Sequence, residues 1–209
     1  MVKSFNATDV AQLAESFTWK DYRAWPDETR WELLGGTAIA MSPSPGVRHQ
    51  ALATRIGGVF SGFFKGKNCR PFVAPLDVKL SEHDVVQPDL LVVCDPAQIK
   101  DTHIEGAPTL VVEIVSPSSE KQDRLAKMKL YERFGIKEYW IVTPYPPLLE
   151  IHTLESGRLS LHSGGSLGEK ISSPTFPHLE IDLTEVFDLP FTEEERKIFV
   201  VKEPPAKYA

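Results

Sequence analysis

One stretch of the sequence restricts the fold more than any other, because a strand, a helix and a second strand follow one another along it. Residues 109–115 are short and almost continuously apolar, which is typical of a strand covered on both faces. Residues 119–134 predict a helix that Gly135 would end, and residues 138–142 predict another apolar strand. Such crossovers join parallel strands, so we expect an α/β protein with a partly parallel sheet.

The other periodic segments add two hairpins, helices and further strands. Gly35-Gly36 and Ser156-Gly157 are two-residue turn signals between apolar runs. From Val47 to Phe64 the apolar residues recur three or four apart, which predicts a helix with one core-facing stripe. We therefore expect a mixed β-sheet (α+β) flanked by helices, with a hairpin near each end. The predicted elements are a helix over 9–15, a hairpin of 30–34 and 37–41, a helix over 47–64, strands over 72–80 and 85–94, and a hairpin of 148–154 and 158–162.

Length and composition limit the class of protein. The chain has 209 residues, of which 42% are hydrophobic and 25% charged, and this excludes a wholly disordered chain or a disulfide scaffold. Residues 1–200 are expected to form a single domain, followed by a loose tail over 201–209. The net charge of −6 makes nucleic acid a less favoured partner without excluding it.

Neither a membrane span nor an exported protein is expected. No apolar run approaches the roughly 18 residues that a membrane helix requires. Residues 1–6 lack the apolar core of a signal peptide, and Cys69 and Cys94 do not form a CxxC pair. We therefore expect a cytoplasmic protein with free thiols.

Two acidic residues interrupt apolar strands. Asp89 lies in the run 87–93 and Glu113 in the run 110–115. An unpaired buried carboxylate costs several kcal/mol, so each must face water, meet a cation or bind a metal. The alternative is an exposed strand end or a structural pair with Lys or Arg. Neighbouring strands lie about 4.8 Å apart, so two such acids can be aimed at one point and form a hard oxygen site for Mg²⁺.

The helix after Glu113 supplies further candidates. Asp123, Lys127 and Tyr131 are spaced four apart and share one face of that helix. If the helix runs antiparallel over the sheet, the Lys127 side chain can reach Glu113. The alternative is an ordinary Asp123–Lys127 surface pair worth about 0.3 kcal/mol. The backbone carbonyl of Ile114 is a possible third metal ligand.

At these residues the chain resembles the PD-(D/E)xK nuclease superfamily with its restriction-endonuclease-like fold, and most closely its bacterial Uma-type branch. The resemblance covers most of the chain and consists of several motifs in order. These are residues 31–36, 41–43, 48–50, 78–81, 88–89, 112–118, the 123, 127 and 131 helix face, 138–140 and 179–183.

The resemblance implies roles for individual residues. Asp89 and Glu113 would hold Mg²⁺, or Mn²⁺ in its place. The usual ExK lysine would fall at position 115, where this chain has Val115, and Lys127 in the following helix would replace it. Glu32 matches an early acidic residue and would be a further ligand or would orient water, although a Glu on a hairpin edge is also commonplace.

His49 matches the family as well, and a lone helical His is more often structural or a support for a ligand. We group it with Asp123 and Tyr131 as supporting residues. The family often has Asp and Glu where this chain has Gly35 and Thr37, a departure that leaves the Asp89–Glu113 pair intact.

The expected function is a Mg²⁺-dependent endonuclease that hydrolyses DNA phosphodiester bonds with water as nucleophile. Cleavage of both strands of a duplex would favour a homodimer. The alternatives are a domain that binds nucleic acid or protein without catalysis, and a metal-dependent hydrolase of a smaller phosphate substrate.

Overall fold

The protein is described by a computed structural model over residues 16–26, 29–41, 45–116 and 119–188. The helix expected over 9–15 and the tail expected over 201–209 lie outside these residues. No helix in the described ranges is long and apolar enough to span a membrane. The helices are α2 (Trp19–Tyr22), α3 (Val47–Phe64), α4 (Met128–Phe134), α5 (Leu183–Phe187), and the short turns η1 (Pro96–Gln98) and η2 (Gln122–Lys127).

The larger sheet has the strand order β11-β10-β9-β8-β6-β3. β8 and β9 are parallel, because the helix between them returns the chain to the end of the sheet at which β8 began. The other neighbouring strands are antiparallel. The expected crossover and C-terminal hairpin are therefore confirmed. The strands are β3 (Arg70–Val73), β6 (Leu90–Val93), β8 (Leu110–Ile114), β9 (Glu138–Thr143), β10 (Leu148–Glu155) and β11 (Arg158–Gly165).

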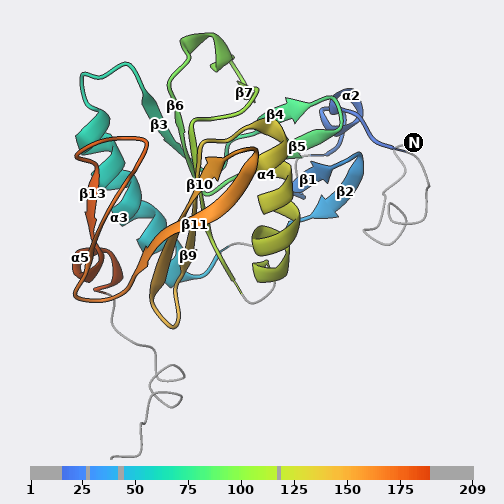
Figure 1. The fold of residues 1–209 in the computed structure, drawn as a ribbon. Coiled ribbons are helices and arrows are strands. Elements are labelled where there is room, and N and C mark those ends of the chain that lie inside the picture. The colour runs from blue at the N-terminus through green and yellow to red at the C-terminus, as the bar shows by residue number, and fades with distance from the viewer. Residues whose placement is uncertain (1–15, 27–28, 42–44, 117–118, 189–209) are drawn as a thin grey trace, which may run out of the picture.

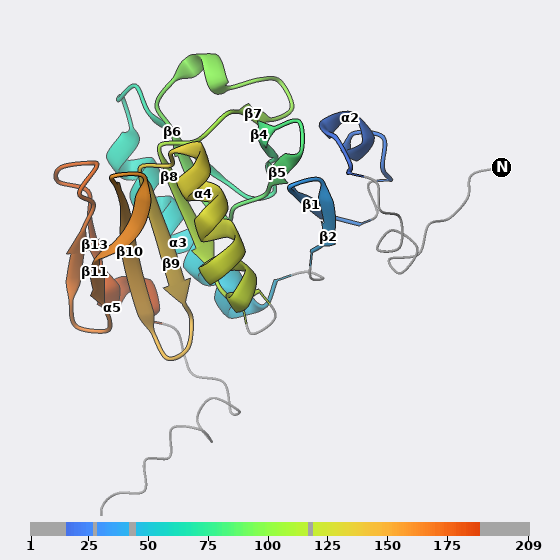
Figure 2. The same ribbon diagram turned by 45° about the vertical axis from the view of Figure 1, so that its right-hand side comes forward.

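Helices α3 and α4 cover opposite faces of this sheet (Figures 1 and 2). Alternate residues of β8 belong to two separate cores: Val112 packs in the cluster of α3, and Val111 packs in the cluster of α4. Glu113 follows Val112 and so points to the α4 side. The predicted bounds of α3 are confirmed. Val47, however, is 88% exposed and does not belong to the apolar stripe that faces the core, whereas Leu52 is fully buried in it.

A smaller sheet carries the N-terminal hairpin and has the order β2-β1-β5-β4-β7. The predicted hairpin is confirmed, and both glycines of its turn have positive φ. A separate two-stranded ribbon lies near α5 (Figure 1). The strands are β1 (Trp31–Leu34), β2 (Thr37–Ala40), β4 (Val78–Ser81), β5 (Asp84–Val86), β7 (Ile104–Glu105), and in the ribbon β12 (Lys170–Ser172) and β13 (Glu180–Asp182).

The strands predicted over 72–80 and 85–94 are wrong as continuous strands. Each is broken in the middle, and its two halves belong to different sheets. Pro75 and Pro88 lie in the breaks, and proline has no N–H to donate to a ladder. Asp89 consequently lies at the junction immediately before β6, where the chain passes from one sheet to the other.

The helix predicted over 119–134 is present but is not α-helical throughout. Its middle, η2, is a π-helical turn, a rare form often found at functional sites. α4 continues from η2 and ends at Gly135, whose φ of 74° is left-handed as predicted.

The expectation of free thiols is wrong, because Cys69 and Cys94 form a disulfide with a Cα–Cα distance of 4.0 Å. Arg70 of β3 pairs with Val93 of β6, so the residues just outside this pair stand opposite each other. The proximity depends on strand register, which sequence spacing does not reveal.

Candidate active site

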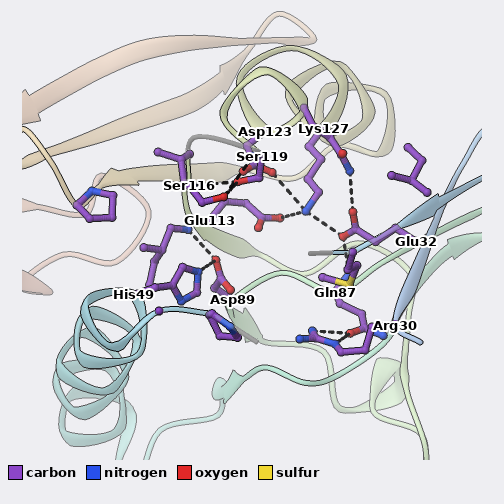
Figure 3. A pocket seen from close by; sticks show the side chains of 18 of the residues that line it. Arg30, Glu32, His49, Gln87, Asp89, Glu113, Ser116, Ser119, Asp123 and Lys127 are labelled. Carbon is purple, nitrogen blue, oxygen red and sulfur yellow. Dashed lines mark hydrogen bonds and ion pairs between the residues drawn. The ribbon is translucent and has the colours of Figure 1, made fainter. Parts of the chain in front are cut away.

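A pocket of about 640 Å³ opens where the two sheets, the start of α3 and η2 meet (Figure 3). Asp89, Glu113 and Lys127 all line it, and so do Glu32 and His49. Residues far apart in the sequence thus meet at one place, as the sequence motifs predicted for this set.

Asp89 and Glu113 come together because β6 and β8 are antiparallel neighbours. The register pairs Leu90 with Val112. Because the strands are antiparallel, Asp89, just before Leu90, stands opposite Glu113, just after Val112. Asp89 Oδ2 accepts a hydrogen bond of 2.7 Å from the Ile114 backbone N–H. Neither acid is paired with a guanidinium in the described ion pairs, and both face the pocket.

His49 supports the first of these acids. Its Nε2 atom lies 3.2 Å from Asp89 Oδ2, and the ring comes from the first turn of α3 (Figure 3). The predicted supporting position of His49 therefore corresponds to a contact with Asp89.

Lys127 lies at the centre of a cluster of carboxylates. Its Nζ atom is 2.9 Å from Glu113 Oε1, 2.9 Å from Glu32 Oε1 and 3.4 Å from Asp123 Oδ1. The side chain is buried, so the surface-pair alternative for Asp123 and Lys127 is wrong. Lys129 on the same helix is exposed.

The helical segment places three side chains on the site. Asp123, Lys127 and Tyr131 are all buried toward the sheet, as their spacing predicted. The Tyr131 hydroxyl donates a 2.7 Å hydrogen bond to Glu113 Oε1, the same oxygen that Lys127 contacts. Tyr131 thereby fixes the orientation of the Glu113 carboxylate.

Glu32 is 2% exposed and does not lie on an open hairpin edge. Its Oε1 accepts a 3.0 Å hydrogen bond from the Gln87 backbone N–H, and its Oε2 accepts one of 2.9 Å from Gln122 Nε2. The positions that depart from the family, Gly35 and Thr37, lie in the hairpin turn and start of β2 and are not among the described residues of the pocket wall. The absence of acidic side chains at these two positions therefore leaves the acids of the pocket wall unchanged.

The electrostatics of the cluster follow from burial. Burial raises the pKa of Glu113 well above its usual value, because Lys127 offsets only part of the effect and the other carboxylates add to it. Burial also raises the pKa of Asp123, against the opposing effect of Lys127. Burial would lower the pKa of Lys127, but the surrounding carboxylates outweigh it and hold that pKa well above its usual value. The amine therefore stays protonated at neutral pH.

The donor set fits a hard divalent cation. Three carboxylates contact the single ammonium of Lys127 and a fourth, that of Asp89, lines the same pocket, so the site holds an excess of acidic groups that a cation would balance. Hydrogen bonds among the described residues use Oδ2 of Asp89 and Oε1 of Glu113, which leaves the second oxygen of each for a ligand.

The number of protein ligands also matters. Across the described ranges no three His, Cys, Asp or Glu side chains form a ready-made metal cage. Mg²⁺ is commonly bound through one or two carboxylates with water completing the octahedron, so two acids are sufficient. Val115 N–H bonds to Val142 O, and alternation along β8 turns the Ile114 carbonyl toward the β6 side, next to Asp89.

Sequence reasoning did not identify several polar residues of the pocket. Gln87 and Gln122 hold Glu32, and Arg30 donates two hydrogen bonds to Gln87 Oε1. Ser119 lies on the pocket wall one turn before Asp123. Gln87 had a signal, because it is a polar residue directly before the Pro-Asp motif, whereas Arg30, Gln122 and Ser119 had none.

Comparison with known proteins decides the family. The family model described as "Uma2: Putative restriction endonuclease" matches residues 19–184, which is more than half of the chain. The chain belongs to the Uma2 family. Among curated proteins, "Uncharacterized protein slr1290" of Synechocystis sp. (strain ATCC 27184 / PCC 6803 / Kazusa) is 30% identical over 115 residues. That match covers 54% of this chain, and this chain spans 60% of the length of that relative.

A solved structure shows the fold. The protein described as a putative nuclease belonging to DUF820 from Anabaena variabilis ATCC 29413 superposes with a TM-score of 0.67 at 18% identity. The superposition covers 82% of this chain and 98% of that chain. The predicted restriction-endonuclease-like fold is therefore confirmed.

In this Uma2 family member, the structure shows which residue takes the place of the ExK lysine that is missing at position 115. Val115 lies on the pocket wall one residue beyond β8, and its own N–H is used in the ladder to β9. The cation beside Glu113 comes instead from η2, in Lys127. Asp123 and Lys127 both belong to this π-helical turn and both line the pocket.

Proposed function

We propose that this protein is a Mg²⁺-dependent endonuclease that hydrolyses DNA phosphodiester bonds in the Asp89–Glu113 pocket. The supporting observation is the convergence of two strand-borne carboxylates with the buried ammonium of Lys127. A phosphodiester is an anion, and Lys127 supplies a fixed positive charge beside the place where it would bind.

The contacts of the pocket residues suggest a different role for each of them. Asp89 and Glu113 would hold the metal, with the Ile114 carbonyl as a third protein ligand. When bound there, Mg²⁺ would activate water and neutralise charge on the phosphate. Mn²⁺ prefers similar oxygen ligands and would be able to substitute.

Lys127 acts as a cation and not as a general base. Its carboxylate neighbours hold its pKa well above the usual value, so it carries no free electron pair at neutral pH. It is suited to orienting the attacking water or stabilising the phosphate. Glu32 accepts a hydrogen bond from the Gln87 backbone N–H and contacts the Lys127 amine on the side away from Glu113 (Figure 3).

Cleavage assays on plasmid and end-labelled duplex with Mg²⁺ or Mn²⁺ test the proposal. Asp89→Asn and Glu113→Gln are expected to lose at least about 100-fold in cleavage rate, because the loss of a metal position removes several kcal/mol of transition-state stabilisation. DNA binding in EDTA should persist. Asp101→Asn, which changes an exposed acid, is the matched control.

The two alternatives give different results. A binding domain without catalysis would bind DNA in a salt-sensitive manner but show no cleavage that depends on Asp89 or Glu113. A hydrolase of small phosphate compounds would turn over such a substrate and show no salt-sensitive DNA affinity. We further propose that cleavage of both strands of a duplex uses a homodimer, which sedimentation with and without DNA tests.

A further inference from the structure

A second pocket, of about 380 Å³, lies directly beside the first and shares Arg30 and Gln87 with it. It is formed by α2, the residues that lead into β1, and Asp77 before β4. None of its residues apart from the shared two has a role in the mechanism above.

Three aromatic rings form one part of the wall of this second pocket. The ring centroids of Tyr22 and Trp25 are 5.7 Å apart, and those of Trp25 and Trp31 are also 5.7 Å apart. All three side chains are only half-buried. Rings held in place and partly open to solvent are suited to stacking against the π-face of a planar ligand.

Another part of the wall is polar and is held by hydrogen bonds. Asp77 Oδ1 accepts hydrogen bonds from the Tyr22 hydroxyl at 2.6 Å and from Gln87 Nε2 at 2.8 Å. The Gln87 backbone N–H bonds to Glu32 in the first pocket. A ligand in the second pocket would thus be positioned relative to the candidate catalytic residues.

Two guanidinium groups complete the second pocket. Arg30 donates to Gln87 Oε1 through Nε and Nη2, at 2.8 and 2.6 Å, and lines both pockets. Arg23 lies exposed at the end of α2. Among the described residues of its wall, this pocket has two arginines and one acid, Asp77, in a chain whose net charge is −6. It therefore favours an anion that also carries a planar group.

We infer that the second pocket binds one unpaired nucleotide of the DNA strand, next to the phosphodiester held in the first pocket. This inference rests on the proposed function. A nucleotide combines a phosphate for the arginines with a base for the aromatic rings. A base within a duplex has its faces covered by its neighbours and its pairing edge occupied, so only a base outside the stack can enter such a pocket. The protein is therefore expected to prefer single strands, flaps or junctions over continuous duplex.

Binding of fluorescent oligonucleotides in EDTA tests the inference without cleavage. Trp25→Leu keeps an apolar side chain but removes the stacking ring, and should weaken single-strand binding about tenfold while changing duplex binding less than about twofold. Arg23→Gln should reduce the dependence of single-strand binding on salt by about 0.7 in the log–log slope. Lys20→Gln, which removes an exposed charge from the same helix, is the matched control and should cause neither change.

The outcomes separate this inference from the proposed function. Equal affinity of the wild type for single strands and duplex, or equal effects of Trp25→Leu on both, would overturn the nucleotide subsite. If circular dichroism shows that Trp25→Leu does not fold, Arg23→Gln is used to test the inference instead, because Arg23 is exposed. Cleavage that depends on Glu113 but shows no Trp25-dependent preference refutes the subsite alone. Trp25-dependent single-strand binding without Glu113-dependent cleavage supports the subsite and refutes the proposed catalysis.

Discussion

Replacement of Lys127 by Met should destabilise the protein strongly. The Lys127 amine is the cation that contacts Glu32, Glu113 and Asp123, at 2.9, 2.9 and 3.4 Å, and its side chain is only 5% exposed. Met has a similar length, so little cavity forms and the main effect is electrostatic. The removal of one partner from a buried ion pair typically costs about 3–5 kcal/mol, because the remaining charge is left uncompensated.

Urea denaturation at pH 8 in EDTA measures this cost for Lys127→Met. Lys129→Met, which changes an exposed lysine two residues away, should stay within about 0.5 kcal/mol of the wild type. The double variant Glu113→Gln/Lys127→Met should recover part of the loss, because one of the uncompensated charges is then absent. Addition of Mg²⁺ should also raise the stability of Lys127→Met if the remaining carboxylates bind it.

The pH dependence of the Lys127→Met penalty has a definite sign. Burial raises the pKa values of Glu113 and Asp123 in the folded state, so their contribution to stability is complete below the unfolded values and is lost as pH rises through the folded ones. Without the ammonium these pKa values rise further, and the penalty should therefore be smaller at pH 5 than at pH 8. A loss below about 1 kcal/mol at pH 8, or one independent of pH, would refute the electrostatic account.

Three further predictions concern single features of the structure. Glu113→Gln in EDTA should raise the free energy of unfolding at pH 8 by about 0.5–2 kcal/mol, since the wild-type carboxylate has a raised pKa; thermal melts should show the gain vanishing toward pH 4, and a loss at pH 8 would contradict it. Replacing Cys69 and Cys94 together by Ser should cost about 3.5 kcal/mol, from a loop of 25 residues, and dithiothreitol should lower the urea midpoint of the wild type but not of the variant. Gly135→Ala should cost about 1 kcal/mol by thermal denaturation because of its left-handed φ, whereas Gly62→Ala on the exposed face of α3 should not destabilise the protein.

The elements that the sequence predicted well are those with a strong local signal. α3 has the predicted bounds because apolar residues at helical spacing identify the buried face, and Gly135 ends α4 because its left-handed conformation strongly favours glycine. The strands over 72–80 and 85–94 were predicted as continuous because alternation persists through the breaks. Period-two alternation reports which side of a local surface is buried, but it does not report to which sheet a segment belongs.

The candidate site divides in the same way. A carboxylate in an apolar strand is visible in the sequence, and this singled out Asp89 and Glu113. Lys127 was reached through its helical spacing and a family resemblance. The roles of Gln87 and Gln122 were not visible, because an amide that anchors Glu32 looks like any polar residue until both segments are placed.

The sequence alone determined where chain segments become helices or strands and which acids cannot rest unpaired in the core, because these depend on neighbours within a few residues. The tertiary structure decided the pairing of β6 with β8, the contact of Lys127 with three carboxylates, and the Cys69–Cys94 bond. These depend on strand register and on the packing of α4 across the sheet. Apart from Asp123 and Lys127, which are four residues apart on one helical face, these contacts join residues separated by 14 to 95 positions, so local spacing carries no record of them.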